Sequence, residues 1–252
     1  MIVVHFSDYH GDLGTRLPDA DVYVCTGDMT PNWPSLFFMT AWDRDLVEVD
    51  YDHRFEHVND TYCGRKLKPA LEKSRQEQWI AQQNFRRECF GLASIDAPVA
   101  CVRGNHDFTD LAPLFGGDVW EVSLDPSRTI ELFDLKFGGV RGVMPIGSEW
   151  SDETTDNDML EQTNKIPMDV DVLISHSPPM GVLDGYRGSH YGAQALKNYI
   201  VRREYAEYDG GKKLLAHAFG HIHEANERKD EGGTIYSNAA CSHRVLEIGK
   251  KH

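Results

Sequence analysis

Side chains of the kinds that bind metal ions follow five separate predicted strands, and this placement constrains the fold more than any other feature of the sequence. The runs are short, apolar and mostly β-branched, as expected of strands. Because ligands of α/β folds gather at the carboxyl ends of strands, we expect all of these side chains to meet at one edge. The seven ligand-type residues are Asp8 and His10 in SDYHGD, Asp28 in CTGDMT, Asn105 in RGNHD, His176 in ISHSPP, and His221 and His223 in FGHIHE.

The chemistry of these seven side chains indicates which ions they could hold. Imidazole nitrogens with carboxylate and amide oxygens suit divalent manganese, iron or zinc, and do not make a thiolate site. Seven ligands exceed the need of one tetrahedral ion but suit two ions that share a bridging carboxylate. Two such ions roughly 3.5–4 Å apart form the clamp used for in-line displacement at phosphorus. The sequence therefore predicts two divalent metal ions and phosphoryl chemistry.

Each cluster taken alone has an ordinary structural explanation. Asp8 and His10 would point the same way if the chain stayed extended, but an Asp after a strand often caps a turn. GNHD also fits an Asn/Asp-rich turn, and a single His176 after a buried strand fits a hydrogen-bonded core residue. The GHIH pair is the most specific, although solvated histidines at a strand edge would look the same. Their joint occurrence in one chain favours a single metal site.

Composition restricts the class of protein and the partners that it could bind. The chain has 252 residues, 40% of them hydrophobic and 26% charged, which is typical of a soluble globular α/β domain. No apolar run approaches the roughly 20 residues that span a bilayer, so no membrane partner is expected. MIVVHFSD reads as a first strand and not as a signal peptide. The net charge of −14 argues against extended duplex nucleic acid as a partner.

Cysteine usage indicates the compartment. The five cysteines are odd in number and show no CxxC spacing. Cys25 and Cys101 fall inside apolar strand-like runs, where buried free thiols are common. The sequence therefore predicts a cytoplasmic protein in a reducing environment.

The pattern along the chain predicts alternating strands and helices. Apolar residues at three- and four-residue spacing predict helices over Leu71–Leu92 and Ala193–Tyr205. An aromatic and acidic segment from Pro31 to about Pro69 reads as an insertion, and the charged stretch Asp152–Asp158 as a solvated loop. Strands are expected at Ile2–Phe6, Val22–Thr26, Val99–Arg103, Val119–Leu124, Thr129–Phe133, Asp171–Ser175, Leu214–Phe219, Thr234–Asn238 and Arg244–Ile248.

The order of the motifs, D-x-H, GD, GNHD, a strand-end His and GHxH, closely resembles the calcineurin-like metallophosphoesterase superfamily over nearly the whole chain. The resemblance implies a four-layer α-β-β-α sandwich, with two mixed sheets flanked by helices, in a single domain over residues 1–252 with the insertion at about 31–69. ISHSPPMGVLDGYRG and FGHIHEANE look like the compact phosphodiesterase branch. That branch includes metallophosphoesterase-domain proteins and class III cyclic-nucleotide phosphodiesterase relatives.

The resemblance also implies roles for the site residues. Asp28 would bridge the two metals, His106 would protonate the leaving group, and Asp107 is a candidate for orienting His106. One metal would be held by Asp8, His10, Asp28 and His223, and the other by Asp28, Asn105, His176 and His221.

The predicted function is hydrolysis of phosphoesters. A hydroxide held between two cations would attack phosphorus, and the expected substrate is a phosphodiester of a small organic phosphate or nucleotide. A nuclease of the same superfamily is one alternative, and a catalytically silent scaffold with the same fold is another. The scaffold should have lost ligands or His106, whereas all are present.

Several residues outside these motifs allow two interpretations. His5 and His217 lie within predicted strands and are expected to be packed core histidines. Arg187 and His190 precede a predicted helix and could meet a substrate phosphate there, although a solvated loop is the favoured interpretation. Aromatic residues of the insertion could stack on a base or form the small core of the insertion itself. They are Trp33, Phe37, Phe38 and Trp42.

Overall fold

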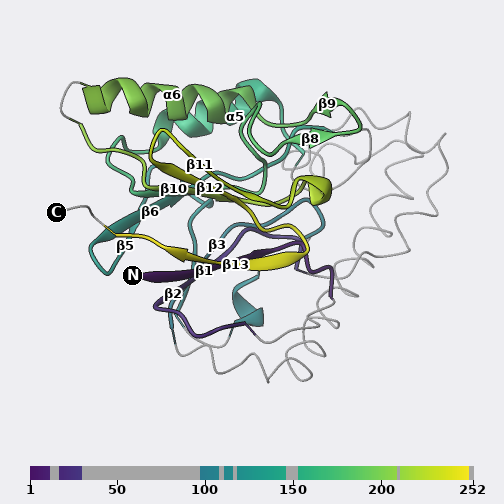
Figure 1. The fold of residues 1–252 in the computed structure, drawn as a ribbon, viewed down its shortest axis with the longest axis vertical. Coiled ribbons are helices and arrows are strands. Elements are labelled where there is room, and N and C mark those ends of the chain that lie inside the picture. The colour runs from purple at the N-terminus through teal and green to yellow at the C-terminus, as the bar shows by residue number, and fades with distance from the viewer. Residues whose placement is uncertain are drawn as a thin grey trace, which may run out of the picture.

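The computed structural model describes residues 1–11, 17–29, 97–107, 111–115, 118–145, 153–208 and 211–249. The predicted insertion at 31–69 and the predicted helix Leu71–Leu92 lie outside these residues. Figure 1 shows two sheets stacked on one another, with helices above the second. Among the described residues, no helix is long and apolar enough to cross a membrane.

The first sheet contains the N-terminal strands and the last strand of the chain. Its order is β13-β1-β2-β3-β4, in which β1 to β4 are parallel and β13 runs antiparallel to β1. All five strands overlap the predicted runs. They are β1 (Ile2–Ser7), β2 (Val22–Cys25), β3 (Val99–Cys101), β4 (Val119–Glu121) and β13 (Ser242–Glu247).

The second sheet has the order β11-β12-β10-β7-β6-β5, with parallel strands in the middle and antiparallel strands at both edges. The predicted α/β class with two mixed sheets is therefore confirmed. Strands β6 and β11 were not predicted, because two glycines interrupt the apolar pattern of β6 (LKFGG) and all four residues of β11 (RKDE) are charged. The six strands are β5 (Ile130–Leu132), β6 (Leu135–Gly139), β7 (Val172–Ile174), β10 (Ala216–Phe219), β11 (Arg228–Glu231) and β12 (Thr234–Asn238).

The hydrophobic core is layered because successive residues of a strand face opposite sides of its sheet. In β1, Val3 packs into the cluster between the sheets, together with Val172 of β7. Val4 and Phe6 face the other way, into a cluster on the outer side of the first sheet. Both sheets thus bury residues on both faces, which explains the nearly continuous apolar runs of the central strands.

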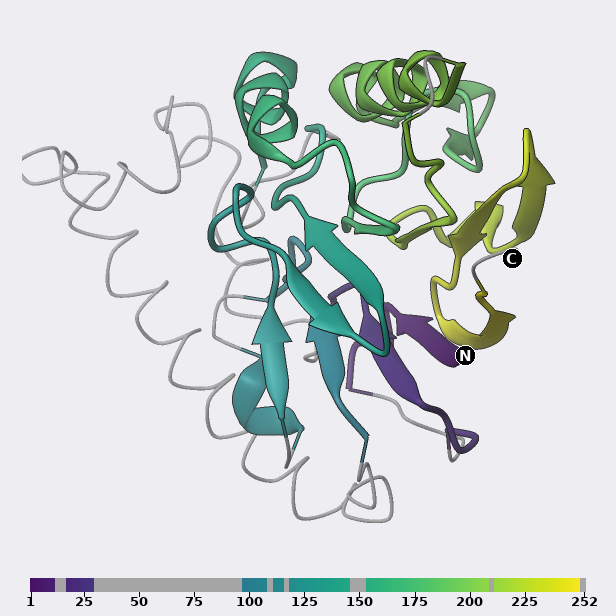
Figure 2. The same ribbon diagram turned by 90° about the vertical axis from the view of Figure 1, so that its left-hand side faces the viewer.

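Two helices, α5 (Asp156–Lys165) and α6 (Gln194–Tyr208), cover the outer face of the second sheet (Figures 1 and 2). Met159 of α5 and Leu196 of α6 are fully buried in the cluster that joins them to this sheet. The prediction of helix Ala193–Tyr205 is confirmed by α6. The two helices place one helical layer against the second sheet.

The prediction of a solvated loop over Asp152–Asp158 is wrong, because α5 begins within it. The hydroxyl of Thr155 accepts the backbone N–H of Asp158 at 3.1 Å and caps the helix. Asp156 and Asp158 lie in the first turn, where carboxylates interact favourably with the helix dipole. The acidic residues that suggested a loop are therefore helix-start signals.

Four short elements complete the described part of the chain. Strands β8 (Gly185–Tyr186) and β9 (Ser189–His190) form a small hairpin. The 3-10 helix η3 (His223–Ala225) follows β10, and a second 3-10 helix, η2 (Ala112–Leu114), follows β3. Figure 1 shows the hairpin and η3 at the same end of the molecule.

Candidate metal centre

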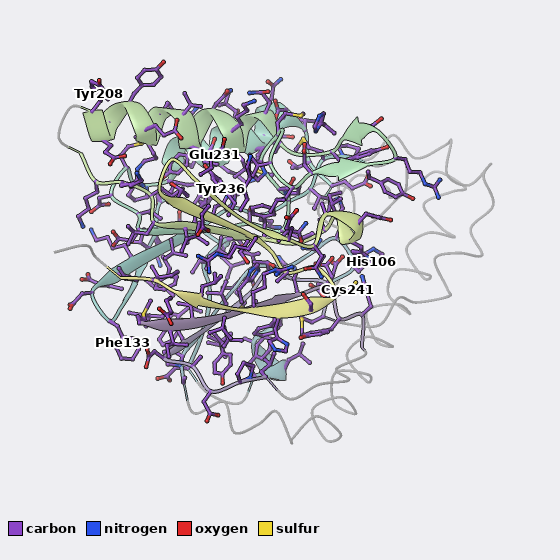
Figure 3. All side chains as sticks on the ribbon, viewed as in Figure 1. His106, Phe133, Tyr208, Glu231, Tyr236 and Cys241 are labelled. Carbon is purple, nitrogen blue, oxygen red and sulfur yellow. The ribbon has the colours of Figure 1, made fainter. Side chains whose placement is uncertain are left out.

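The predicted ligands meet where the parallel strands end. Asp8 follows β1, Asp28 follows β2, Asn105 follows β3, His176 follows β7 and His221 follows β10. In Figure 3 the neighbouring His106 lies at this end of the molecule, whereas Phe133 and Tyr208 lie at the other end. The expected convergence at carboxyl ends is thus found in the structure.

One group of candidate ligand atoms comes from Asp8, His10 and His223, and these atoms lie within 4.8 Å of one another. Nε2 of His223 is 3.3 Å from Oδ1 of Asp8. Nε2 of His10 is 3.4 Å from Nε2 of His223. Two imidazole nitrogens this close share either a hydrogen carried by one of them or a cation that both bind, because two facing lone pairs would repel.

A second group comes from Asp8, Asp28 and His176, again with ligand atoms within 4.8 Å. Nε2 of His176 lies 3.2 Å from Oδ2 of Asp28 and 3.1 Å from Oδ1 of Asn105. Nδ1 of His176 is 2.5 Å from the backbone carbonyl of Thr26, to which it donates. This hydrogen bond directs Nε2 toward the other ligands, as outer hydrogen bonds of metal-binding histidines do.

His221 lies beside the second group, next to His176, whereas His223 belongs to the first. The His221 ring is 5.1 Å from the ring of His176, and the His223 ring is 5.3 Å from that of His10. The backbone N–H of His221 also donates to both carboxylate oxygens of Asp8, at 3.2 and 3.1 Å. The two histidines of GHIH are therefore directed to different parts of one site.

Two buried nitrogens test whether this site suits a cation. Nδ1 of His10 and Nε2 of His221 are buried and have no hydrogen-bond partner among the described residues. A buried polar atom without a partner is costly, and such atoms often belong to functional sites. A divalent cation would satisfy His221 Nε2, which lies among carboxylates and imidazoles. The donor set, nitrogen and oxygen without sulfur, fits manganese, iron or zinc.

The backbone at the ligands adopts a conformation that side chains usually avoid. Asp8, His10, Asp28 and His221 have φ values of 57°, 47°, 53° and 72°. The expectation of an extended path from Asp8 to His10 is therefore wrong, although both side chains still reach the same group. Positive φ outside glycine concentrates at functional sites, where the surrounding structure enforces it.

Glycines next to the ligands allow this close packing. A Cβ on Gly104 would lie 2.0 Å from Oδ1 of Asp28, and one on Gly220 would lie 2.2 Å from Oδ2 of Asp8. No heavier side chain fits at either position without displacing a carboxylate. The glycines of GNHD and GHIH therefore leave the space that the carboxylates of Asp28 and Asp8 occupy.

Charge and burial set the protonation of the site. Although burial opposes ionisation, the neighbouring His176 and His106 hold the pKa of Asp28 well below its usual range. Burial likewise opposes protonation of His176, yet Asp28 and Asp8 raise its pKa to about 9. Burial, aided by the charge of His176, lowers the pKa of His221 to about 3. A neutral His221 and ionised carboxylates are the forms that bind a cation.

His106 and Asp107 lie beside the ligands. The backbone N–H of His106 donates to Oδ1 of Asp28 at 2.7 Å, and burial lowers the pKa of its imidazole to about 4. Asp107 is fully buried and its carboxylate accepts three backbone N–H groups. These come from Asp28 at 2.6 Å, Gly104 at 2.9 Å and Met29 at 3.1 Å. Asp107 thus joins the loops that follow β2 and β3.

A pocket of about 250 Å³ opens onto the site, and part of its lining was not expected from the sequence. Tyr186 and Tyr191 of the β8–β9 region and Glu224 of η3 line it together with Asp28, Asn105, His106, His221, Ile222 and His223. The sequence signal that could have found the tyrosines is DGYRGSHYG, a turn-rich aromatic segment, of which only Arg187 and His190 had been considered.

Several described histidines and cysteines lie outside the groups of candidate ligands. His5 and His217 are fully buried and bonded to Ser237 and Ser175, each at 2.8 Å, so the prediction of core histidines is confirmed. His190 is exposed and its Nδ1 lies 2.7 Å from Oδ1 of Asp184. Cys25 and Cys101 are buried free thiols, as predicted.

The chain is similar to proteins of one known family. The family model described as calcineurin-like phosphoesterase matches residues 1–225. Human metallophosphoesterase domain-containing protein 1 is 38% identical over 84 residues, which cover 32% of this chain and 23% of that protein. Two Caenorhabditis elegans proteins are also similar. UPF0046 protein T07D4.2 is 29% identical over 122 residues (48% of this chain, 29% of that protein), and UPF0046 protein K07C11.7 is 35% identical over 83 residues (33% and 26%).

The aligned regions therefore span less than a third of each of these relatives. The family match, in contrast, extends over most of the chain and includes every ligand-bearing loop described above. The chain belongs to the calcineurin-like phosphoesterase family.

Proposed function

We propose that this protein is a two-metal hydrolase that cleaves phosphodiesters of small organic phosphates or nucleotides. The observation that carries the proposal is the meeting of seven nitrogen and oxygen ligands at one end of both sheets, with two groups of ligand atoms each within 4.8 Å. Asp8 belongs to both groups, and Asp28 lies within reach of His176 and His106.

Two divalent ions fit this arrangement. Asp8, His10, Asp28 and His223 would hold one ion, and Asp28, Asn105, His176 and His221 the other. When bound, such ions lower the pKa of a water molecule between them and offset negative charge on the phosphoryl oxygens. The protein itself contributes buried carboxylates, oriented imidazoles and a backbone fixed by the loop hydrogen bonds.

His106 is the proposed general acid. Its imidazole lines the pocket, and its Nε2 is 3.8 Å from Oδ2 of Asp28. Burial favours the neutral form of His106, but an anionic substrate in the pocket would raise its pKa and favour a transferable proton. We propose that Asp107 acts by positioning, because its carboxylate fixes the loops that carry Asp28 and His106.

The pocket lining supports a preference for diesters. Among the described lining residues there is no lysine or arginine, whereas Asp28 and Glu224 are acidic. A diester carries one negative charge and a monoester near neutral pH carries almost two. With the same metal charge in the site, the acidic lining disfavours the monoester more strongly. The net charge of −14 similarly disfavours long polyanions such as duplex nucleic acid.

A metal-reconstituted activity screen tests the proposal. Protein stripped with a chelator would be reloaded with manganese, ferrous iron or zinc and assayed with bis(p-nitrophenyl) phosphate, p-nitrophenyl phosphate and a single-stranded oligonucleotide. We expect hydrolysis only after reloading, with the small diester cleaved fastest. Faster cleavage of the monoester or the oligonucleotide would contradict the substrate assignment, and no hydrolysis with any metal would contradict the enzyme assignment.

A further inference from the structure

The β8–β9 hairpin closes with a tight two-residue turn. Its two central residues, Arg187 and Gly188, have φ values of 49° and 82°, the pair of positive values that a two-residue type I′ turn requires. The Arg187 guanidinium carbon lies 5.0 Å from the centre of the Tyr186 ring, in cation–π contact. The turn and this contact together fix the orientation of Tyr186.

Asp184 holds the base of the hairpin. It is buried, and one carboxylate oxygen accepts the backbone N–H of Gly181 at 2.9 Å and of Gly192 at 3.1 Å. Its other oxygen lies 2.7 Å from Nδ1 of His190. One carboxylate therefore fastens both ends of the segment that carries Tyr186 and Tyr191.

A second buried side chain joins the hairpin to the GHIH loop after β10. The Asn238 amide donates to the carbonyl of Leu183 at 3.3 Å and to the carbonyl of Ile222 at 2.9 Å. Ile222 separates the two histidines of GHIH, and β8 contacts η3, which begins at His223. The hairpin is thus attached directly to the loop that supplies two metal ligands.

The two tyrosines are placed as one side of the pocket. Tyr186 and Tyr191 are half-buried, and both line the pocket with His106 and Asn105. Their ring centres are 6.0 Å apart and their planes are inclined by 55°, so neither ring covers the face of the other. Rings held in this way can contact a flat group, and base–aromatic stacking is tolerant of the identity of the base.

We propose that Tyr186 and Tyr191 form an aromatic wall that binds the flat organic group of the substrate, such as a nucleobase, while its phosphate lies at the metal site. This inference rests on the proposed function for the position of the phosphate. It places recognition of the organic group on the β8–β9 hairpin, and the substrate class becomes phosphoesters that carry an aromatic base or ring.

Calorimetric titration of the manganese-loaded protein tests the wall without turnover. The two probes are methylphosphonate and the adenosine 5′-phosphonate in which a methylene replaces the ester oxygen. Neither can be hydrolysed, and both carry the same phosphonate charge. The ratio of their dissociation constants therefore reports on the adenosine alone. We expect the wild-type protein to bind the adenosine probe at least about 10-fold more tightly.

Four variants separate ring contact from folding. Tyr186→Ala and Tyr191→Ala should each reduce the preference for adenosine by about 5-fold or more, with methylphosphonate affinity within about 2-fold. Tyr186→Phe keeps the ring and should keep the preference. Tyr205→Ala removes a tyrosine that is 72% exposed on α6 and should change neither affinity.

The outcomes distinguish this inference from the function on which it rests. Equal affinity of the wild type for both probes, or alanine variants with an unchanged ratio, would refute the aromatic wall while methylphosphonate binding still supported the metal site. If neither probe bound the manganese-loaded protein, both the wall and the proposed phosphoester site would be refuted.

Discussion

The carboxylate of Asp107 accepts the backbone N–H of Asp28 at 2.6 Å, although the two residues are 79 positions apart in the chain. Asp107 also accepts the N–H of Met29 and of Gly104. Asp28 has a positive φ of 53°, which costs energy for a residue with a side chain. A buried, charged acceptor for its N–H stabilises this conformation and directs the Asp28 carboxylate to the other ligands.

Replacing Asp107 by Asn tests this positioning role. The change keeps the shape but places an NH2 group where an oxygen accepts backbone N–H groups, so we expect a loss of roughly 2–3 kcal/mol in the free energy of unfolding. The affinity for metal should fall as well, because Asp28 loses its support. Denaturant unfolding and elemental analysis measure the two effects. Asp125→Asn is the matched control, since Asp125 also accepts a backbone N–H, that of Ser127, but at an exposed position. Equal effects of the two substitutions would contradict the role.

Replacing Gly104 by Ala tests the packing of the ligand loops. The new Cβ would lie 2.0 Å from Oδ1 of Asp28, so the carboxylate must move. We expect fewer than two bound ions per chain and hydrolysis reduced by at least about 100-fold, because small displacements at a reacting site are costly. Gly249→Ala is the control, since a Cβ there meets nothing within 4 Å. Unchanged metal content in the Gly104 variant would show that the loops adjust.

Replacing Asp28 by Asn tests the bridge. Asp28 contacts His176 of one ligand group and lies 3.8 Å from His106, and its pKa is held low by these neighbours. An amide offers a neutral oxygen in place of a carboxylate, so both ions should bind more weakly together. Elemental analysis after dialysis measures this loss. Retention of one ion at full occupancy would contradict a shared ligand.

Replacing His106 by Ala separates proton donation from metal binding. A positioned proton donor contributes roughly 10²–10⁴-fold in turnover, and this loss is expected for diesters with alkoxide leaving groups. Esters of p-nitrophenol should lose far less, because that leaving group needs little protonation. Metal content should remain near that of the parent protein. A variant that lost an ion would identify His106 as a ligand.

The ligand-bearing loops could be predicted from the sequence because each follows a short apolar run that forms a strand. The order of the strands could not be derived from those runs, so the link between Asp107 and the loop of Asp28 was not foreseen. The tyrosines of the hairpin were missed for the same reason. Tyr186 is 80 positions from His106 in the sequence, and only the folded sheet brings both to one pocket. The start of α5 was missed because its acidic residues suggested a solvated loop, although Thr155 before them is a helix-capping residue.

Two buried histidines that do not line the pocket should make the stability of the protein depend on pH. His5 lies fully buried between the sheets and His217 lies fully buried on the helix-covered side of the second sheet. Burial, more than any neighbouring charge, lowers the pKa of each to about 3. In the unfolded chain both should titrate near 6.5. Between about pH 6.5 and pH 3 the unfolded chain therefore binds protons that the folded protein does not, and stability must fall as the pH falls.

Each of these histidines should contribute a slope of up to about 1.4 kcal/mol per pH unit below pH 6.5. His217→Gln removes one titrating group. The new amide can still donate to the hydroxyl of Ser175, as His217 does, because the hydrogen of that hydroxyl is donated to the carbonyl of Ser177 at 2.6 Å. Denaturant unfolding in the presence of a chelator, from pH 7.5 to pH 4.5, gives the slope for parent and variant. Contributions of the metal ligands occur in both proteins and cancel in the comparison. Between pH 6 and pH 4.5 the free energy of unfolding should fall by about 1–2 kcal/mol less in the variant than in the parent protein. Parallel curves for the two proteins would mean that His217 becomes charged inside the fold, contrary to its burial.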